Sequence, residues 1–259
     1  MCEIAFHLGS LPVHWYGIFV AAGFLSGIWT ATRRAQRVGL PPENIADIGV
    51  WLLVGAMLGA KALYLATYWR KEFTDESLLQ MVFTRTGFVF YGGLIGATCA
   101  GVFFTWWKKL PVWKTADVLA PSIALGHAFG RIGCLMTGCC FGRVTTVPWA
   151  IHFPEQHPTH GQGVHPTQIY ESLLNFALCA ALAWLFRRKK FDGQVFAAYL
   201  MGYAVLRSVV EMFRGDYEAA LLTGRATPAH WISVVSFVLG LTLFILRRRA
   251  TPAAPQPQP

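Results

Sequence analysis

Three cysteines and an arginine stand close together in the run GRIGCLMTGCCFGR at residues 130–143. Arg131 ends a long apolar stretch, and a charge at membrane depth costs several kcal/mol unless an anion meets it. Cys134, Cys139 and Cys140 supply three thiols, whose thiolate forms are nucleophiles and metal ligands. Two interpretations stay open at this point: Arg131 reaches to the membrane interface from a helix end, or the run forms an anion site inside a membrane protein.

A second group of charges lies in a later apolar run. Arg207 and Glu211 are four residues apart, so they share one face of a helix and are expected to pair. A buried pair of this kind also serves simply to hold helices together. Lys61, Arg131 and Arg207 all lie within apolar runs, and Glu211 alone cannot neutralise three cations. We therefore expect surplus positive charge that attracts a lipid phosphate, which arginine binds through two parallel hydrogen bonds.

Long apolar runs must position these residues. The chain has 259 residues, of which 54 % are hydrophobic and 14 % charged, against about 25 % charged in soluble domains. Runs long enough to cross about 30 Å of hydrocarbon are predicted near 13–32, 45–69, 88–107, 115–133, 167–186, 194–213 and 228–246. Because only helices and closed barrels span lipid, and these runs are too long for barrel strands, the fold class is all-α: a bundle of seven transmembrane helices. Residues 1–250 are predicted as a single membrane domain, and 251–259 as a disordered cytoplasmic tail.

The basic residues between the runs predict the orientation. The net charge of +9 comes from short clusters between apolar runs, which is how membrane proteins set their topology and unlike a nucleic-acid-binding surface. One set of alternate loops holds thirteen Lys and Arg, and the other set holds six. The bias places the C-terminus in the cytoplasm, and the N-terminus and the 134–166 loop outside.

Further candidates lie near run boundaries. His14 and Tyr16 open the first run, where Tyr is also an ordinary interfacial residue. Tyr91 precedes two glycines that allow close approach of a helix or a lipid chain. Thr167 and Glu171 open the fifth run, where Thr167 is a candidate N-cap and a carboxylate in the first turns suits the helix dipole.

Histidines follow the cysteines in the outer loop, which raises the question of a metal site. The set is His157, His160 and His165, together with the three cysteines. Its spacing matches no standard zinc pattern, so the sequence predicts no metal. The six cysteines also do not form a secreted disulfide framework.

Taken together, the motifs resemble those of the prolipoprotein diacylglyceryl transferase family. The matching segments follow the family's order over nearly the whole chain: HWYG at 14–17, YGGLIG at 91–96, GRIG at 130–133, FGRV at 141–144, PWA at 148–150, HPTQIYE at 165–171 and RSVVEMFR at 207–214. The resemblance implies a bacterial inner-membrane enzyme. It implies transfer of the diacylglyceryl group of phosphatidylglycerol to the lipobox cysteine of a lipoprotein precursor, giving a thioether and glycerol phosphate without a cofactor.

The resemblance also implies roles for individual residues. Arg131 and Arg207 stabilise the developing phosphate charge, Glu211 orients Arg207, and Tyr16 lies near the lipid headgroup. Within the FGRV segment, Gly142 and Arg143 are expected at the phosphatidylglycerol site. His14 and Tyr91 complete the expected catalytic set.

Three positions depart from the family pattern. Tyr91 stands where the family usually has His, Cys134 where it has Asn, and Cys139 where it has Glu. Tyrosine has a reference pKa near 10, so His14 and His127 are alternative bases. A second function stays open: a thiol-dependent redox or lipid-binding membrane protein centred on Cys134, Cys139 and Cys140.

Overall fold

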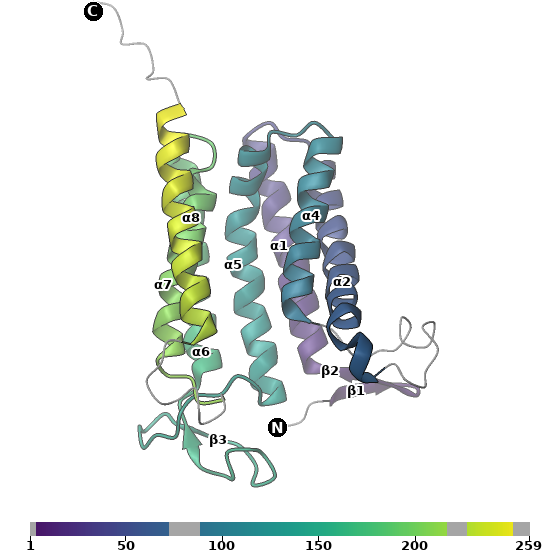
Figure 1. Ribbon diagram of the computed structural model, residues 1–259, viewed down its shortest axis with the longest axis vertical. Coiled ribbons are helices and arrows are strands. Elements are labelled where there is room, and N and C mark those ends of the chain that lie inside the picture. The colour runs from purple at the N-terminus through teal and green to yellow at the C-terminus, as the bar shows by residue number, and fades with distance from the viewer. Residues whose placement is uncertain (1–3, 73–88, 217–226, 251–259) are drawn as a thin grey trace, which may run out of the picture. The chain divides into compact units, whose positions relative to one another are not determined.

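The computed structural model describes residues 4–72, 89–216 and 227–250. Its elements are β1 (Ile4–Leu8), β2 (Leu11–His14), α1 (Trp15–Arg37), α2 (Pro42–Glu72), α4 (Phe90–Trp107), α5 (Val112–Thr137), β3 (Ile151–His152), β4 (Gly163–Val164), α6 (Thr167–Arg188), α7 (Gln194–Glu211) and α8 (Pro228–Ala250). Each predicted apolar run contains one helix, so the helical fold class is confirmed (Figure 1). The predicted tail at 251–259 lies outside the described residues.

Four of these helices are long and apolar enough to cross a membrane. They are found at Pro42–Thr67, Val112–Thr137, Thr167–Arg188 and Pro228–Ala250. The chain is therefore a multi-pass membrane protein. The count of seven spans and the orientation of the termini stay predictions.

The sequence analysis did not anticipate the strands. β1 and β2 form an antiparallel hairpin whose turn includes Gly9, with a φ of 63° that suits glycine. The short strands β3 and β4 pair antiparallel within the segment that joins α5 to α6. Both pairs lie outside the long helices.

The described chain forms two compact units: residues 1–31 with 116–259, and residues 32–115. In the smaller unit, α2 packs on α4 through glycines. A Cβ on Gly96 would overlap the backbone of Gly55 and Gly59, and a Cβ on Gly92 would overlap that of Gly59. The sequence predicted close approach at Gly92, and the partner is a helix, as in small-residue contacts between membrane helices.

In the larger unit, α5 makes polar contacts with three other helices. Ser122 donates to Gly27 O of α1 at 2.5 Å, and Ser172 of α6 donates to Ala128 O of α5 at 2.9 Å. The fully buried Asp117 accepts backbone N–H groups from residues 193, 195 and 196 at 2.9–3.0 Å. Asp117 thereby caps the N-terminus of α7, where a carboxylate suits the helix dipole.

The helices that follow α5 pack against their sequence neighbours. α6 contacts α7, α7 contacts α8, and these helices run alongside one another in Figure 1. Pro121 lies inside α5 without ending it, as proline in membrane helices often does. Arg131 lies at the other end of α5 from Asp117. Because α5 is bonded to neighbouring helices, the position of Arg131 is fixed relative to them.

Candidate functional site

Glu171 on α6 joins the two arginines that the sequence singled out. Its Oε2 lies 3.0 Å from Nε of Arg131 on α5 and 3.3 Å from Nη1 of Arg207 on α7. The Glu171 side chain is only 3 % exposed. One buried carboxylate therefore ties three helices together through two guanidinium groups.

A second carboxylate completes this group of charges. Nη2 of Arg207 lies 2.7 Å from Oε2 of Glu211, which confirms the pairing predicted from their four-residue spacing. The hydroxyl of Thr227 donates to Oε1 of Glu211 at 2.7 Å and lies 2.9 Å from Nδ1 of His230. Arg131, Glu171, Arg207 and Glu211 are called the charged cluster below.

The count of charges predicted from the sequence was wrong, because it left out Glu171. Glu171 lies beyond the first turn of α6, where the backbone N–H groups are already bonded to carbonyls. Thr167 is not the N-cap of α6, which is Pro166, and its hydroxyl donates to Cys140 O at 2.7 Å. With two carboxylates facing two guanidiniums, the cluster is formally neutral, so it carries no surplus positive charge of its own.

The cluster nevertheless keeps donors for an anion. A guanidinium has five N–H donors, which is more than one carboxylate engages, and Nε of Arg131 is the donor that lies 3.0 Å from Glu171. The Arg131 side chain is 21 % exposed and that of Arg207 is 13 % exposed, whereas Glu211 is fully buried. The arginines are thus the accessible members, and Arg131 is the more accessible of the two.

Tyr16 lies beside this region, as expected. Its ring packs against Gly133, which follows Arg131 by two residues on α5. The contact is close enough that a Cβ on Gly133 would come within 2.9 Å of the ring. Tyr16 remains 45 % exposed. His14 is exposed at the end of β2.

His127 lies one turn before Arg131 on α5. Its ring centroid is 5.0 Å from that of Tyr203, and its Nδ1 is buried without a hydrogen-bond partner among the described residues. In a neutral imidazole one ring nitrogen donates and the other accepts, so the tautomer decides which role Nδ1 can take toward a ligand.

Gly142 and Arg143 have structural contacts. Gly142 N donates to His165 O at 3.0 Å, and a Cβ on Gly142 would come within 2.8 Å of Phe213 O. Arg143 donates from Nε to Arg214 O at 3.0 Å. Both residues therefore fasten the segment after α5 to the end of α7.

Tyr91 and Lys61 belong to the smaller unit. Tyr91 is 50 % exposed in the first turn of α4, and Lys61 is buried on α2 with its Nζ 5.6 Å from the centre of the Tyr64 ring. Their expected roles beside the arginines stay predictions.

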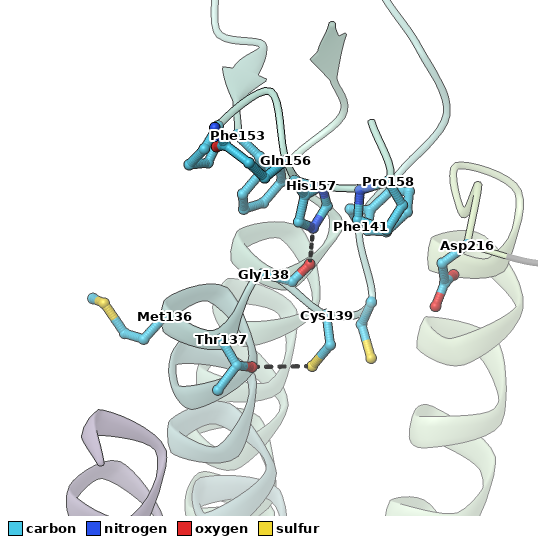
Figure 2. A pocket seen from close by; sticks show the side chains of 12 residues that line it. Met136, Thr137, Gly138, Cys139, Phe141, Phe153, Gln156, His157, Pro158 and Asp216 are labelled. Carbon is cyan, nitrogen blue, oxygen red and sulfur yellow. Dashed lines mark hydrogen bonds between the residues drawn. The ribbon is translucent and has the colours of Figure 1, made fainter. Parts of the chain in front are cut away.

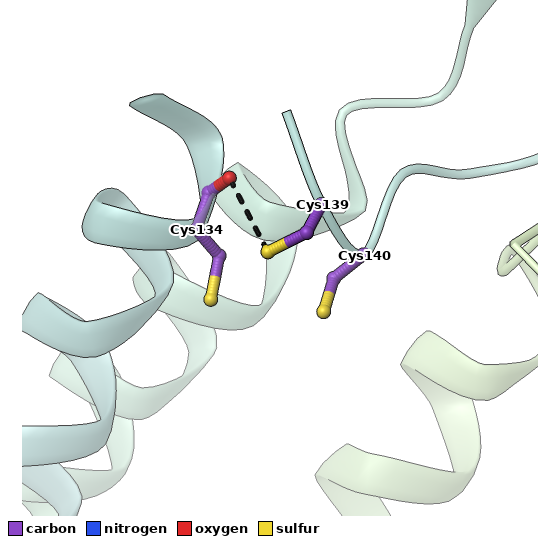
Figure 3. A group of neighbouring side chains, drawn as sticks. All are labelled: Cys134, Cys139 and Cys140. Carbon is purple, nitrogen blue, oxygen red and sulfur yellow. Dashed lines mark hydrogen bonds between the residues drawn. The ribbon is translucent and has the colours of Figure 1, made fainter. Parts of the chain in front are cut away.

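The three cysteines converge, as Figure 3 shows. The sulfur atoms of Cys134, Cys139 and Cys140 all lie within 4.8 Å of one another, and all three are free thiols. The Thr137 hydroxyl lies 3.3 Å from Sγ of Cys139. Hydrogen bonds from the Cys134 and Cys139 thiols, with the positive charge of Arg131, hold the pKa of Cys140 below its usual range.

A cleft of about 620 Å³ opens beside two of these thiols (Figure 2). Cys139 and Cys140 line one part of it, with His157 and Asp216 elsewhere on its wall. His157 is held by contacts of its Nε2 with Gly138 O at 2.9 Å and of its Nδ1 with the Thr159 hydroxyl at 3.0 Å. The cleft is large enough for a peptide side chain or a lipid headgroup.

Two residues of this region were not predicted from the sequence: Thr227 was not identified, and Glu171 was identified but not as the partner of the arginines. Glu171 carried a usable signal, since a carboxylate more than one turn inside an apolar run needs a partner. Thr227 carried none, because a threonine before a helix is ordinary.

Comparison with known proteins bears on all of these residues. Residues 3–246 match the family model described as prolipoprotein diacylglyceryl transferase. The chain is 35 % identical to the phosphatidylglycerol–prolipoprotein diacylglyceryl transferase of Bacillus cytotoxicus, over 95 % of this chain and 92 % of the relative. Proteins of the same name from Synechococcus elongatus (34 % identity, 96 % and 90 % covered) and Clostridium tetani (30 % identity, 96 % and 98 % covered) are also similar. The match covers the charged cluster, the cysteines and the helices of the described residues up to residue 246 in α8. The chain therefore belongs to the prolipoprotein diacylglyceryl transferase family and is a transferase.

Proposed function

We propose that this protein transfers the diacylglyceryl group of phosphatidylglycerol to the lipobox cysteine thiol of a lipoprotein precursor. The family membership and the names of the relatives support the substrates. The observation that carries the proposal is the charged cluster, in which two guanidiniums are held by buried carboxylates inside a membrane protein.

The reaction breaks a carbon–oxygen bond and forms a carbon–sulfur bond. The lipobox thiol gives up its proton, and the thiolate attacks the glycerol carbon that carries the phosphate. Glycerol phosphate leaves with the electron pair of the broken bond. Fixed N–H donors in a site poor in water stabilise the charge that develops on the phosphate.

Arg131 is the better placed arginine for that contact. It contacts one carboxylate of the charged cluster, whereas Arg207 contacts two, and its side chain is the more exposed. Arg207 contacts two carboxylates, so it is positioned more rigidly and adds positive charge behind Arg131. Tyr16 lies at the exposed edge, where it meets the headgroup.

Two groups are proposed as candidates to take the thiol proton. These are His14 at the end of β2 and Tyr91 on α4. We further propose that the enzyme lies in the bacterial inner membrane with its N-terminus outside, so that the charged cluster serves the outer half of the membrane.

The test compares three Arg→Lys variants in turnover per folded molecule. Purified protein receives labelled phosphatidylglycerol and a lipobox peptide. Arg131→Lys is expected to lose about 10²–10³-fold, because lysine lacks the paired planar donors. Arg207→Lys is expected to lose less. Arg188→Lys is the matched control, since Arg188 stacks on Trp184 at the other end of α6 and is expected to keep parental turnover. Parental turnover in both Arg131→Lys and Arg207→Lys would overturn the proposal.

A further inference from the structure

The three converging cysteines have no part in the proposed reaction, in which the nucleophile is the substrate's own thiol. Two of them, Cys139 and Cys140, follow the end of α5, and Cys134 lies in its last turn. All three sulfurs lie within 4.8 Å of one another (Figure 3). A disulfide would use only two of these sulfurs, so the convergence of the third needs another explanation.

A turn after α5, which was not predicted from the sequence, brings the three thiols together. Helix α5 ends at Thr137, and Gly138 has a φ of 77°, which reverses the chain. Cys140 has a φ of 63°, an uncommon conformation for a residue with a Cβ. A conformation of that kind persists only where its surroundings enforce it.

Two side chains of α6 enforce it. Gln168 donates from Nε2 to Cys139 O at 2.7 Å, and Thr167 donates to Cys140 O at 2.7 Å. With both carbonyls held on the α6 side, the two side chains are turned toward Cys134. The thiols therefore meet at a geometry that is set in advance.

That geometry suits a metal ion. A zinc–sulfur bond is about 2.3 Å long, so sulfurs around a tetrahedral ion lie about 4 Å apart. The sulfurs of the three cysteines lie no more than 4.8 Å apart, which is compatible with that separation. Only small side-chain rotations are needed to bring the three sulfurs onto one ion.

We propose that Cys134, Cys139 and Cys140 bind one thiophilic divalent ion of the zinc class as three thiolates. The ion takes the place of three thiol protons, which pass to solvent, and the complex carries a net charge of −1. Arg131 and Arg214 lie near enough to act electrostatically on Cys140, although each is also paired with a carboxylate, Glu171 and Asp216 respectively. The Thr137 hydroxyl lies 3.3 Å from Sγ of Cys139, close enough to donate a hydrogen bond to that sulfur once it is a metal-bound thiolate.

The fourth coordination position would face the cleft that Cys139 and Cys140 line (Figure 2). Zinc sites with three protein ligands and one open position bind water or a substrate atom there. A thiol of a second molecule is the ligand that such a position favours, because the ion already prefers sulfur. The inference does not depend on the proposed function, since metal binding is measured without lipid or peptide.

The experiment titrates the full-length protein, purified with reductant, freed of metal and without an affinity tag. Co²⁺ and Cd²⁺ are the probes, because their thiolate complexes absorb by sulfur-to-metal charge transfer. We expect one equivalent to bind with this absorption, and the absorption to disappear in Cys139→Ser and in Cys140→Ser. Cys99→Ser and Cys179→Ser are matched controls that should keep it, since those thiols lie on α4 and α6 outside the cluster.

A further variant separates a designed site from chance binding. Thr137→Val keeps all three thiols and is expected to weaken Cd²⁺ binding by about 10–100-fold. The proposal is overturned if the reduced protein shows no charge-transfer absorption. It is also overturned if the absorption survives in Cys139→Ser and Cys140→Ser, or if the purified protein holds a Cys134 disulfide that binds no metal after reduction.

Discussion

Two helix contacts in this protein are built on opposite principles. The contact of α2 with α4 uses Gly55 and Gly59 against Gly92 and Gly96, so backbone meets backbone with hardly any side chain between. The contacts among α5, α6 and α7 pass instead through the charged cluster. Since lipid tails are as apolar as leucine, neither contact is driven by the hydrophobic effect.

The glycine contact serves only to assemble the helices, whereas the charged cluster can also take part in the reaction. A glycine contact depends on shape, and it offers nothing to a substrate beyond the space it leaves. A charged cluster needs exact partners to repay the cost of removing charge from water, but its N–H donors also serve a ligand. Substitutions in the two places are therefore expected to have different signatures: loss of folded protein in one, and loss of turnover as well in the other.

Among the substitutions that compare these two contacts, the largest effect is expected for Glu171→Gln. The change removes the charge that faces both Arg131 and Arg207, and breaking a buried ion pair on one side costs about 3–5 kcal/mol. Turnover per folded molecule is expected to fall by about 10²-fold, because both guanidiniums lose their orientation. Thermal unfolding in lipid nanodiscs measures the first quantity, and the labelled-lipid assay measures the second.

Glu155→Gln makes the same chemical change at an exposed position of the segment between α5 and α6. It should leave both measurements at the parental values. A Glu171→Gln protein with parental turnover would show that the cluster is only a structural joint.

The helices of both contacts could be predicted from the sequence, but the residues that contact one another across them could be predicted only in part. Apolar run length predicts where each helix lies, because lipid leaves the backbone few alternatives. The Arg207–Glu211 pair follows from a spacing of four within one helix. Gly92 and Gly93 indicated a close approach, although not which helix would make it.

The rest of the site depends on contacts between residues far apart in the chain. Glu171 meets Arg131 across forty residues, and Thr227 meets Glu211 across a segment outside the described residues. Periodicity carries no information on such distances. The cysteines were visible as a group, but their convergence needs the turn at Gly138 and the two donors of α6, which no spacing rule encodes.

An intermediate effect is expected where the glycine contact is broken. In Gly96→Ala the new Cβ would overlap backbone of α2, so the helices must move apart at a cost of about 1–3 kcal/mol. Gly126→Ala is the matched control on α5, where a Cβ meets nothing within 4 Å. There alanine should stabilise the helix by up to about 1 kcal/mol.

Unfolding of both variants in nanodiscs tests these opposite signs. Equal stability of the two variants would contradict a backbone contact between α2 and α4. Turnover per folded molecule is also measured for Gly126→Ala, to verify that this control variant keeps its fold.

The smallest effect is expected for Thr227→Val, which nearly preserves shape and removes the hydroxyl that donates to Oε1 of Glu211. Thr227 is buried, and a hydrogen bond of this kind in a membrane protein is worth about 1 kcal/mol. Glu211 keeps Arg207 at 2.7 Å, so turnover should fall only a few-fold. Thr98→Val is the matched control, because that hydroxyl bonds only to Leu94 O on its own helix. If Thr227→Val matched Glu171→Gln in lost turnover, Glu211 rather than Glu171 would be the carboxylate that positions the arginines, and the cluster would have to be rebuilt around α7.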